Sequence, residues 1–274
     1  MDHDIPTVVK SAHFDAVADA KALRAAMKGL GTDEMAIINI LCKRSNKQRQ
    51  AIDLEFSKQF GRNLIDDLKS ELSRHFETLV LGLMVPTPLL CARELKKAMK
   101  GLGTDEDVLV EMLCARSTKE VKKIVEAYDK EFGGKGTLEK DVRGDTSGPF
   151  ERMLIMAIAG ARDDKLHDKA KACEQAAALY KAGEARLGTD EDTFVQILSS
   201  LGPQQAQLVF SEYTKLASGH SIDQALAHEF SGHLLTGVMA IVRSLRDRHD
   251  YFAERLDLAM KGYSFSWLLW SIHF

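Results

Sequence analysis

Apolar side chains recur every three or four positions along most of this chain, which is the spacing of one face of a helix. Ile37, Leu41 and Cys42 form one such stripe, and comparable stripes follow it. Gly61 and Pro86 stand where individual helices should end. No segment alternates apolar and polar residues as a half-buried strand would. The pattern therefore predicts an all-α protein, with five helices in each stretch of about 70 residues.

A turn that recurs along the chain interrupts the helical pattern. Residues 27–34 read MKGLGTDE, residues 99–106 read the same letters, and residues 183–191 read GEARLGTDE. Self-similarity at this spacing indicates an array of structural repeats. The boundaries predicted are an N-terminal segment at 1–14, repeats at 15–87 and 88–160, a linker with a third repeat at 161–247, and the start of a fourth repeat with an apolar tail at 248–274.

Each repeat also carries an acidic residue about 40 positions after the last glycine of its turn. These residues are Glu71, Asp145 and Glu229. Within the first turn, Thr32 is expected to cap the following helix, and Glu34 lies in its first turn, where the helix dipole favours an acid.

Composition narrows the class of partner. The net charge is −3 and the pI is near 6.3, so the chain has no strong bulk attraction for nucleic acid or for an anionic membrane. A cation would have to mediate binding to an acidic surface. No basic and apolar leader opens the sequence, and no run of about 18 apolar residues occurs. None of the four cysteines forms a CxxC pair, so we expect a cytoplasmic protein with Cys42 and Cys114 buried at equivalent positions.

These features together resemble the annexin family. The resemblance rests on the repeated turn, on residues 67–72 (DLKSEL) and 144–148 (GDTSG), and on residues 251–255 (YFAER), which resemble the opening of a fourth copy. It implies an annexin-like array of four five-helix repeats in a right-handed superhelical arrangement. This chain has three repeats and the beginning of the fourth.

The residues after Gly262 depart from the family. Residues 263–274 (YSFSWLLWSIHF) contain no turn and no calcium loop, so the fourth repeat is expected to be truncated. Because the first and fourth repeats of annexins pack together, the first repeat is expected to expose an apolar face. The tail would cover that face, insert at a membrane or stay disordered, and the sequence leaves these alternatives open.

The resemblance also implies the ligands of a calcium ion. Calcium takes about 6–8 oxygen ligands, and glycines let successive carbonyls point inward without a clashing Cβ. In each copy, three backbone carbonyls and one bidentate acid would bind the ion and leave positions open for a lipid phosphate. The implied sets are Met27, Gly29, Gly31 and Glu71; Met99, Gly101, Gly103 and Asp145; and Gly183, Arg186, Gly188 and Glu229.

Two further roles follow from the turns. Leu30, Leu102 and Leu187 stand at their tips and would dip into the lipid headgroup layer, unless they fold back onto their helices. Thr32 and Glu34 would form a minor second calcium site, unless Glu34 serves only the helix dipole.

The main hypothesis is therefore calcium-dependent binding to anionic phospholipid of the phosphatidylserine type, by a protein that is not an enzyme. It would act on the cytosolic face of membranes when calcium rises, with lateral self-assembly there as a further expectation. The alternatives are a helical scaffold with vestigial calcium sites, whose protein partner docks on residues 1–14 or on the exposed first repeat, and a truncated isoform with impaired folding. Residues 228–233 (HEFSGH) resemble a zinc-protease signature, but their histidines are five positions apart and would not share a helix face.

Overall fold

The computed structural model describes residues 10–29 and 31–261, and its regular structure there is entirely helical. The predictions made for Leu30, for most of the N-terminal segment and for the tail at 263–274 lie outside the described residues. Within them, the all-α prediction is confirmed.

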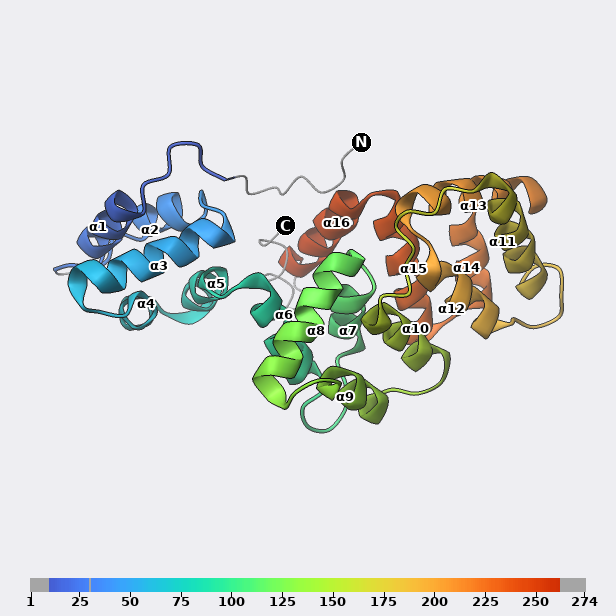
Figure 1. Ribbon diagram of the computed structural model, residues 1–274, viewed down its shortest axis with the longest axis horizontal. Helices are drawn as coiled ribbons and strands as arrows, with labels where there is room; N and C mark the ends of the chain where they lie inside the picture. The colour runs from blue at the N-terminus through green and yellow to red at the C-terminus, as the bar shows by residue number, and fades with distance from the viewer. Residues whose placement is uncertain (1–9, 30, 262–274) are drawn as a thin grey trace. The chain divides into compact units, whose positions relative to one another are not determined.

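The described helices follow the repeat of the sequence (Figure 1). The first copy contains α1 (Ala16–Ala26), α2 (Glu34–Leu41), α3 (Asn46–Phe60), α4 (Leu64–Glu71) and α5 (Arg74–Met84). The second contains α6 (Thr87–Ala98), α7 (Glu106–Leu113), α8 (Thr118–Phe132), α9 (Thr137–Asp145) and α10 (Gly148–Ala159). The third contains α11 (Lys169–Ala182), α12 (Glu191–Ser200), α13 (Pro203–Leu216), α14 (Ile222–Glu229) and α15 (Gly232–Arg246), and α16 (Arg248–Met260) follows.

The chain divides into two compact units, and the copies are shared unequally between them. The first unit runs to Leu90 and includes the residues from Phe252 on, and the second extends from Cys91 to Tyr251. The first unit therefore contains the first copy, and the second contains nearly all of the second and third copies. The exact repeat boundaries given above stay a prediction.

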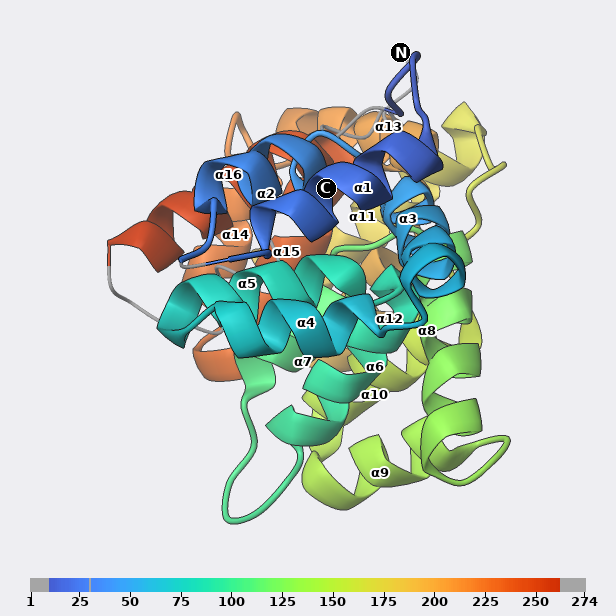
Figure 2. The same cartoon turned by 90° about the vertical axis from the view of Figure 1, so that its left-hand side faces the viewer.

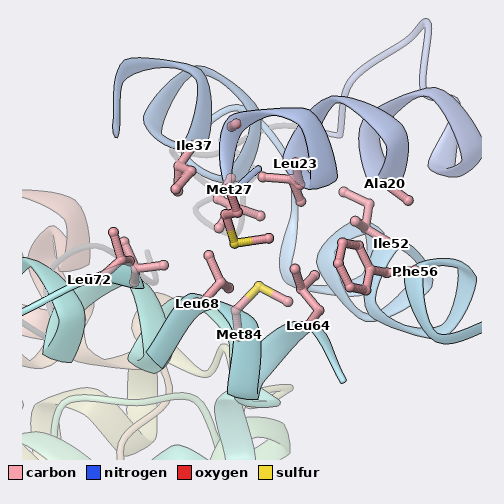
Figure 3. Close-up of a cluster of buried hydrophobic side chains, with 13 residues drawn as sticks. Ala20, Leu23, Met27, Ile37, Ile52, Phe56, Leu64, Leu68, Leu72 and Met84 are labelled. Atoms are coloured by element: carbon pink, nitrogen blue, oxygen red, sulfur yellow. The ribbon is translucent and has the colours of Figure 1, made fainter. Parts of the chain in front are cut away.

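The core of the first unit is formed by apolar side chains that α1 to α5 turn toward one another (Figure 3). Leu23 of α1, Ile52 and Phe56 of α3, and Leu64 and Leu68 of α4 are all fully buried. Figure 2, which faces this unit, shows α4 and α5 side by side with α1 and α2 above them. These are the positions at which the sequence repeats apolar residues every three or four places, so the helical stripes become one shared core.

Helix boundaries in the first copy largely follow the sequence signals. Ser45 caps α3 through a capping box with Gln48, and Gly61 ends the same helix in the left-handed conformation at φ 61°. The predicted cap of α2 is wrong by one position. Asp33, and not Thr32, accepts the hydrogen bond from the backbone N–H of Ala36. The hydroxyl of Thr32 is thereby left for another partner.

Arginine side chains satisfy the last carbonyls of the second helix in two of the copies. Arg49 of α3 is buried and donates to the carbonyls of Leu41 at 3.1 Å and Leu83 at 2.7 Å, which joins α2 and α5 to α3. In the second copy, Arg162 donates to the carbonyls of Cys114 at 3.2 Å and Arg116 at 3.0 Å. Helix-end carbonyls have no partner within their own helix, so these bonds stabilise the ends of α2 and α7.

In the third copy, the backbone of the linker satisfies the carbonyl at the end of the second helix. The backbone N–H of Asp163 donates to the carbonyl of Ser200 at 3.0 Å, at the end of α12. A Cβ on Gly202 would lie 2.4 Å from the Asp163 carbonyl oxygen and 2.7 Å from the Asp164 Cα. Glycine is therefore needed at this position so that the linker can lie directly against the turn between α12 and α13.

Two expectations from composition have different outcomes. Cys114 is buried as predicted, but Cys42 is exposed, so the prediction for Cys42 is wrong. Cys42 follows the last residue of α2 as its cap, where the side chain is not drawn into the core.

Across residues 10–29 and 31–261, no helix is long and apolar enough to cross a membrane.

Replacing Gly202 with alanine should destabilise the second unit, because the new methyl group meets backbone that cannot rotate away. We expect the free energy of unfolding to fall by about 1–3 kcal/mol, measured by urea denaturation. Gly144→Ala in α9 is the matched control, because a Cβ there meets nothing within 4 Å. Equal stability of the two variants would contradict the close packing of the linker.

Candidate functional site

Each of the three repeated turns joins the first helix of a copy to the second, and the same backbone hydrogen bond closes all three. The N–H of the aspartate that caps the second helix donates to the carbonyl of an alanine that ends the first. The pairs are Asp33 to Ala26 at 2.9 Å, Asp105 to Ala98 at 2.9 Å, and Asp190 to Ala182 at 2.8 Å.

Glycines bend the backbone inside each closed turn. Gly29 and Gly31 have φ values of 117° and 87°, and Gly101 and Gly103 have 106° and 91°. A residue with a Cβ is strained at these angles, which explains the glycines. Within the described part of the first two turns, no backbone N–H donates to a carbonyl predicted to bind calcium, so those oxygens keep their lone pairs available.

The structure brings the distal acid of each copy to its turn. Each acid is the last residue of the fourth helix, and the threonine that follows the glycines donates its hydroxyl to the carboxylate. The Thr32 Oγ1 to Glu71 Oε2 distance is 2.6 Å, and Thr104 lies 3.3 Å from Asp145 Oδ2. Thr189 makes the same bond to Glu229.

The contact between the turn threonines and the distal acids is the feature that the sequence did not predict. Thr32 was expected to cap a helix, but its hydroxyl donates to a carboxylate 39 residues away. The minor calcium site expected of Thr32 and Glu34 stays a prediction. The signal was present, because threonine recurs at the same place in all three turns. It could not be separated from a capping signal, since threonine is a common residue before a helix.

The third turn has the same contacts with a different backbone. It has one more residue between the closing alanine and aspartate than the other two turns. The N–H of Arg186 donates to the carbonyl of Gly183 at 3.0 Å, so this predicted ligand oxygen has one of its lone pairs engaged. A Cβ on Gly183 would lie 3.3 Å from the Glu229 carboxyl carbon, which places this glycine directly beside the acid.

A second carboxylate in the fourth helix holds the acid of the first site in position. Asp67 lies one helical turn before Glu71 and is buried. It accepts hydrogen bonds from Arg62 at 2.6 to 3.1 Å, and the Arg24 guanidinium of α1 lies 3.5 Å away. The hydrogen bond from Arg62 lowers the pKa of Asp67, against the opposing effect of burial.

The second copy uses the same position with different partners. Asp141 of α9 accepts hydrogen bonds from Lys96 of α6 at 2.8 Å and from the Tyr128 hydroxyl at 2.6 Å. Burial, together with the hydrogen bond to Asp141, raises the pKa of Tyr128, so the hydroxyl remains a donor. The third copy has Ala225 at this position, and there Glu184 of the turn accepts from Tyr213 at 3.3 Å.

The tips of the turns project away from the protein. Leu102 and Leu187 are fully exposed, at 108% and 102% of their reference areas. Neither side chain folds back onto its helix, so that alternative does not hold for these two residues. Leu30 lies outside the described residues.

The donor set suits a hard cation such as calcium. In the part of the chain that the structure describes, no three His, Cys, Asp or Glu side chains gather into a metal-binding group. His228 and His233 belong to α14 and α15, and the helices are interrupted between them, which agrees with the rejection of a zinc-protease site. Each turn instead offers backbone carbonyl oxygens and one carboxylate, and these are the ligands that calcium prefers.

Comparison with known proteins settles the family. The Annexin family model matches residues 18–83, 91–157 and 175–241, well over half of the chain. The chain is an annexin. These three matched stretches contain the three turns and their distal acids, and each begins within the first helix of its copy.

Curated relatives and solved structures agree with this assignment. Annexin B10 of Drosophila melanogaster is 46% identical over 260 residues, covering 94% of this annexin and 80% of the relative. Annexin A5 of Cynops pyrrhogaster is 48% identical over 258 residues, covering 93% and 79%. The structure of annexin III matches with a TM-score of 0.87 at 40% identity, covering 97% of this chain and 82% of its own. Calcium-bound annexin (Sm)1 matches with a TM-score of 0.84 at 31% identity, covering 98% and 80%.

Family membership carries a function with it. Annexins bind phospholipid membranes in a calcium-dependent way, and this annexin therefore belongs to that functional class. The comparisons support this hypothesis and give no support to a protein scaffold with vestigial sites.

Replacing Asp67 with asparagine should destabilise the first unit in a pH-dependent way. The lowered pKa means that the charged carboxylate stabilises the folded state above its unfolded pKa of about 3.9, and that this stabilisation is lost as the pH falls through the folded value. We expect a loss of about 1 kcal/mol near neutral pH that shrinks below about pH 4.

Urea denaturation across this pH range measures the effect. Asp66→Asn is the control, because Asp66 is the exposed neighbour in the same helix. A loss that is constant from neutral to acidic pH would mean that Asp67 acts through its shape and not through its charge.

Proposed function

We propose that this annexin binds calcium at all three turns and that the bound ions join it to anionic phospholipid. The ligands in each copy are three turn carbonyls with the distal carboxylate. They are Met27, Gly29, Gly31 and Glu71; Met99, Gly101, Gly103 and Asp145; and Gly183, Arg186, Gly188 and Glu229.

One observation carries the proposal. In each copy, a carboxylate about 40 residues away in the sequence is hydrogen-bonded to the threonine of the turn. A helical scaffold with vestigial sites would not need this contact, and a lost acid in any copy would break it. All three copies have the acid, the threonine and the glycine directly before it, while Arg186 takes the place of the other turn glycine in the third copy.

The ligand count explains why a membrane completes the site. Three carbonyls and a bidentate carboxylate provide about five of the 6–8 oxygens that calcium takes. When calcium is bound, its remaining coordination positions are open to oxygen atoms of water or of a lipid phosphate. A single carboxylate leaves the site with net positive charge, so an anionic headgroup is a better final ligand than a neutral one.

The protein surface fits this dependence on a cation. With a net charge of −3, the chain alone has no bulk attraction for an acidic membrane. The exposed Leu102 and Leu187, with Leu30 as their equivalent in the first turn, would enter the headgroup layer once the turns are docked. We place this activity on the cytosolic face of membranes when calcium rises, with phosphatidylserine-type lipid as the partner. No catalytic role is proposed.

Removing the three distal carboxylates should abolish calcium-dependent membrane binding. The variant combines Glu71→Gln, Asp145→Asn and Glu229→Gln, and its helix content should stay close to that of the parent, measured by circular dichroism. The assay is co-sedimentation with phosphatidylserine vesicles in calcium and in chelator, beside a vesicle-free tube that detects aggregation.

The matched control removes the same charge elsewhere. Asp66→Asn, Glu126→Gln and Glu174→Gln change exposed acids outside the turns and should leave calcium-dependent binding intact. Calcium-dependent pelleting of the distal-acid variant at the parental level would refute the ligand assignment.

Replacing the tip leucines should weaken membrane binding without loss of stability. Leu102→Ser and Leu187→Ser together remove apolar area that is exposed in the free protein and buried only in lipid. We expect affinity for vesicles to fall about tenfold, with an unchanged urea midpoint.

Leu54→Ser tests whether any exposed leucine would have this effect, because Leu54 is 59% exposed in the middle of α3. A lower urea midpoint in the tip variant, or equal binding of the tip and Leu54 variants, would argue against membrane contact.

A further inference from the structure

The fifth helix of every copy begins at a residue with a left-handed backbone. The φ values are 57° at Arg74, 64° at Gly148 and 58° at Gly232. Glycine adopts this conformation freely, whereas a residue with a Cβ is strained in it. Two copies use glycine, and the first copy alone has arginine. Backbone strain at Arg74, which the other two copies avoid with glycine, indicates that the arginine side chain has a function.

The surroundings of Arg74 give its side chain no structural role. Arg74 is exposed, and its backbone carbonyl accepts a hydrogen bond from the Thr78 hydroxyl at 3.1 Å. The other arginines between residues 10 and 90 all have partners. Arg24 and Arg62 bind Asp67, Arg44 binds Asp19, and Arg49 binds backbone carbonyls. Among the described residues, the Arg74 guanidinium has no such partner.

Arg74 lies close to the proposed calcium turn of the first copy. It follows Glu71 by three residues, which limits the backbone path between them to roughly 10 Å. The Glu71 carboxylate in turn meets Thr32 of the turn at 2.6 Å. The backbone of Arg74 therefore lies at the same end of the first unit as the turn, at the first residue of α5.

Its chemistry matches a phosphate group. A guanidinium presents a planar fork of N–H donors that pairs with phosphate oxygens, and it stays charged at every physiological pH. The other two copies have no charged side chain at this position, since a glycine occupies it.

We propose that Arg74 binds lipid phosphate directly, beside the calcium turn of the first copy. This contact gives the first copy an electrostatic attraction to anionic membranes that calcium does not supply. The proposal rests on the proposed function, because it takes the turn to face the membrane, and it adds a residue outside the calcium ligands.

Arg74→Gly tests the proposal, because it removes the charge and relieves the backbone at the same time. Binding to phosphatidylserine vesicles at limiting calcium and low salt should weaken about fivefold. The thermal midpoint should rise, since glycine fits the left-handed backbone. In about 0.5 M salt, where exposed charges are screened, the difference in binding should largely disappear.

Two further variants separate charge from folding. Arg74→Lys keeps the charge and the strain but not the planar fork of donors, so its binding should lie between that of the parent and that of Arg74→Gly. Gly232→Arg places an arginine at the equivalent position of the third copy, where a Cβ meets nothing within 4 Å. This variant should bind vesicles more strongly at low salt and have a lower thermal midpoint.

The outcomes distinguish this proposal from the function on which it rests. Unchanged low-salt binding of Arg74→Gly, or a loss in Arg74→Lys as large as that in Arg74→Gly, overturns the role of Arg74 and leaves calcium-dependent binding in place. Absence of vesicle binding by the parent protein, in calcium and at low salt, overturns both.

Discussion

A backbone carbonyl binds a cation best when no N–H group competes for its lone pairs, and a turn usually satisfies its carbonyls internally. In this annexin, each turn is instead closed by a hydrogen bond between the two helices that it joins. One hydrogen bond, from the capping aspartate to the last alanine of the preceding helix, fixes each loop. In the first two turns, the glycines inside the loop then take left-handed angles, and the carbonyls proposed as calcium ligands accept from no described backbone N–H. The proposed calcium binding depends on that arrangement.

The second requirement is a carboxylate at the same place, and the fold provides it from far away in the sequence. The fourth helix ends beside the turn, and a threonine hydroxyl joins the two. The helix is held there by packing of its apolar face. The ion pair of buried Asp67 with the exposed Arg62 adds to this in the first copy, and a lysine and a tyrosine do so in the second. The third copy achieves the same contact without either, since Ala225 replaces the supporting acid. The carboxylate position is therefore maintained while its support varies.

Variation among the copies follows what each helix packs against. The carbonyls that end the second helix need donors, and three different groups supply them: Arg49 from the same copy, Arg162 from the linker, and the backbone N–H of Asp163. The last of these requires the linker to lie against Gly202. The long spacing before the third turn, which in the sequence resembles a flexible connection, is thus partly a packed element of the second unit.

The sequence by itself determined the helices, the three turns and the identity of the distal acids, because helical periodicity, glycine turns and repeated letters are local signals. It also indicated the family, since the signals agree in three copies. It did not determine that Thr32 bonds to Glu71 while Asp33 caps α2, that Cys42 is exposed while Cys114 is buried, or that Arg74 occupies a left-handed position. Only the tertiary structure decided these points. The physical reason is that they depend on which helix end lies beside which turn, and contacts between residues about 40 positions apart leave no periodic trace in either segment.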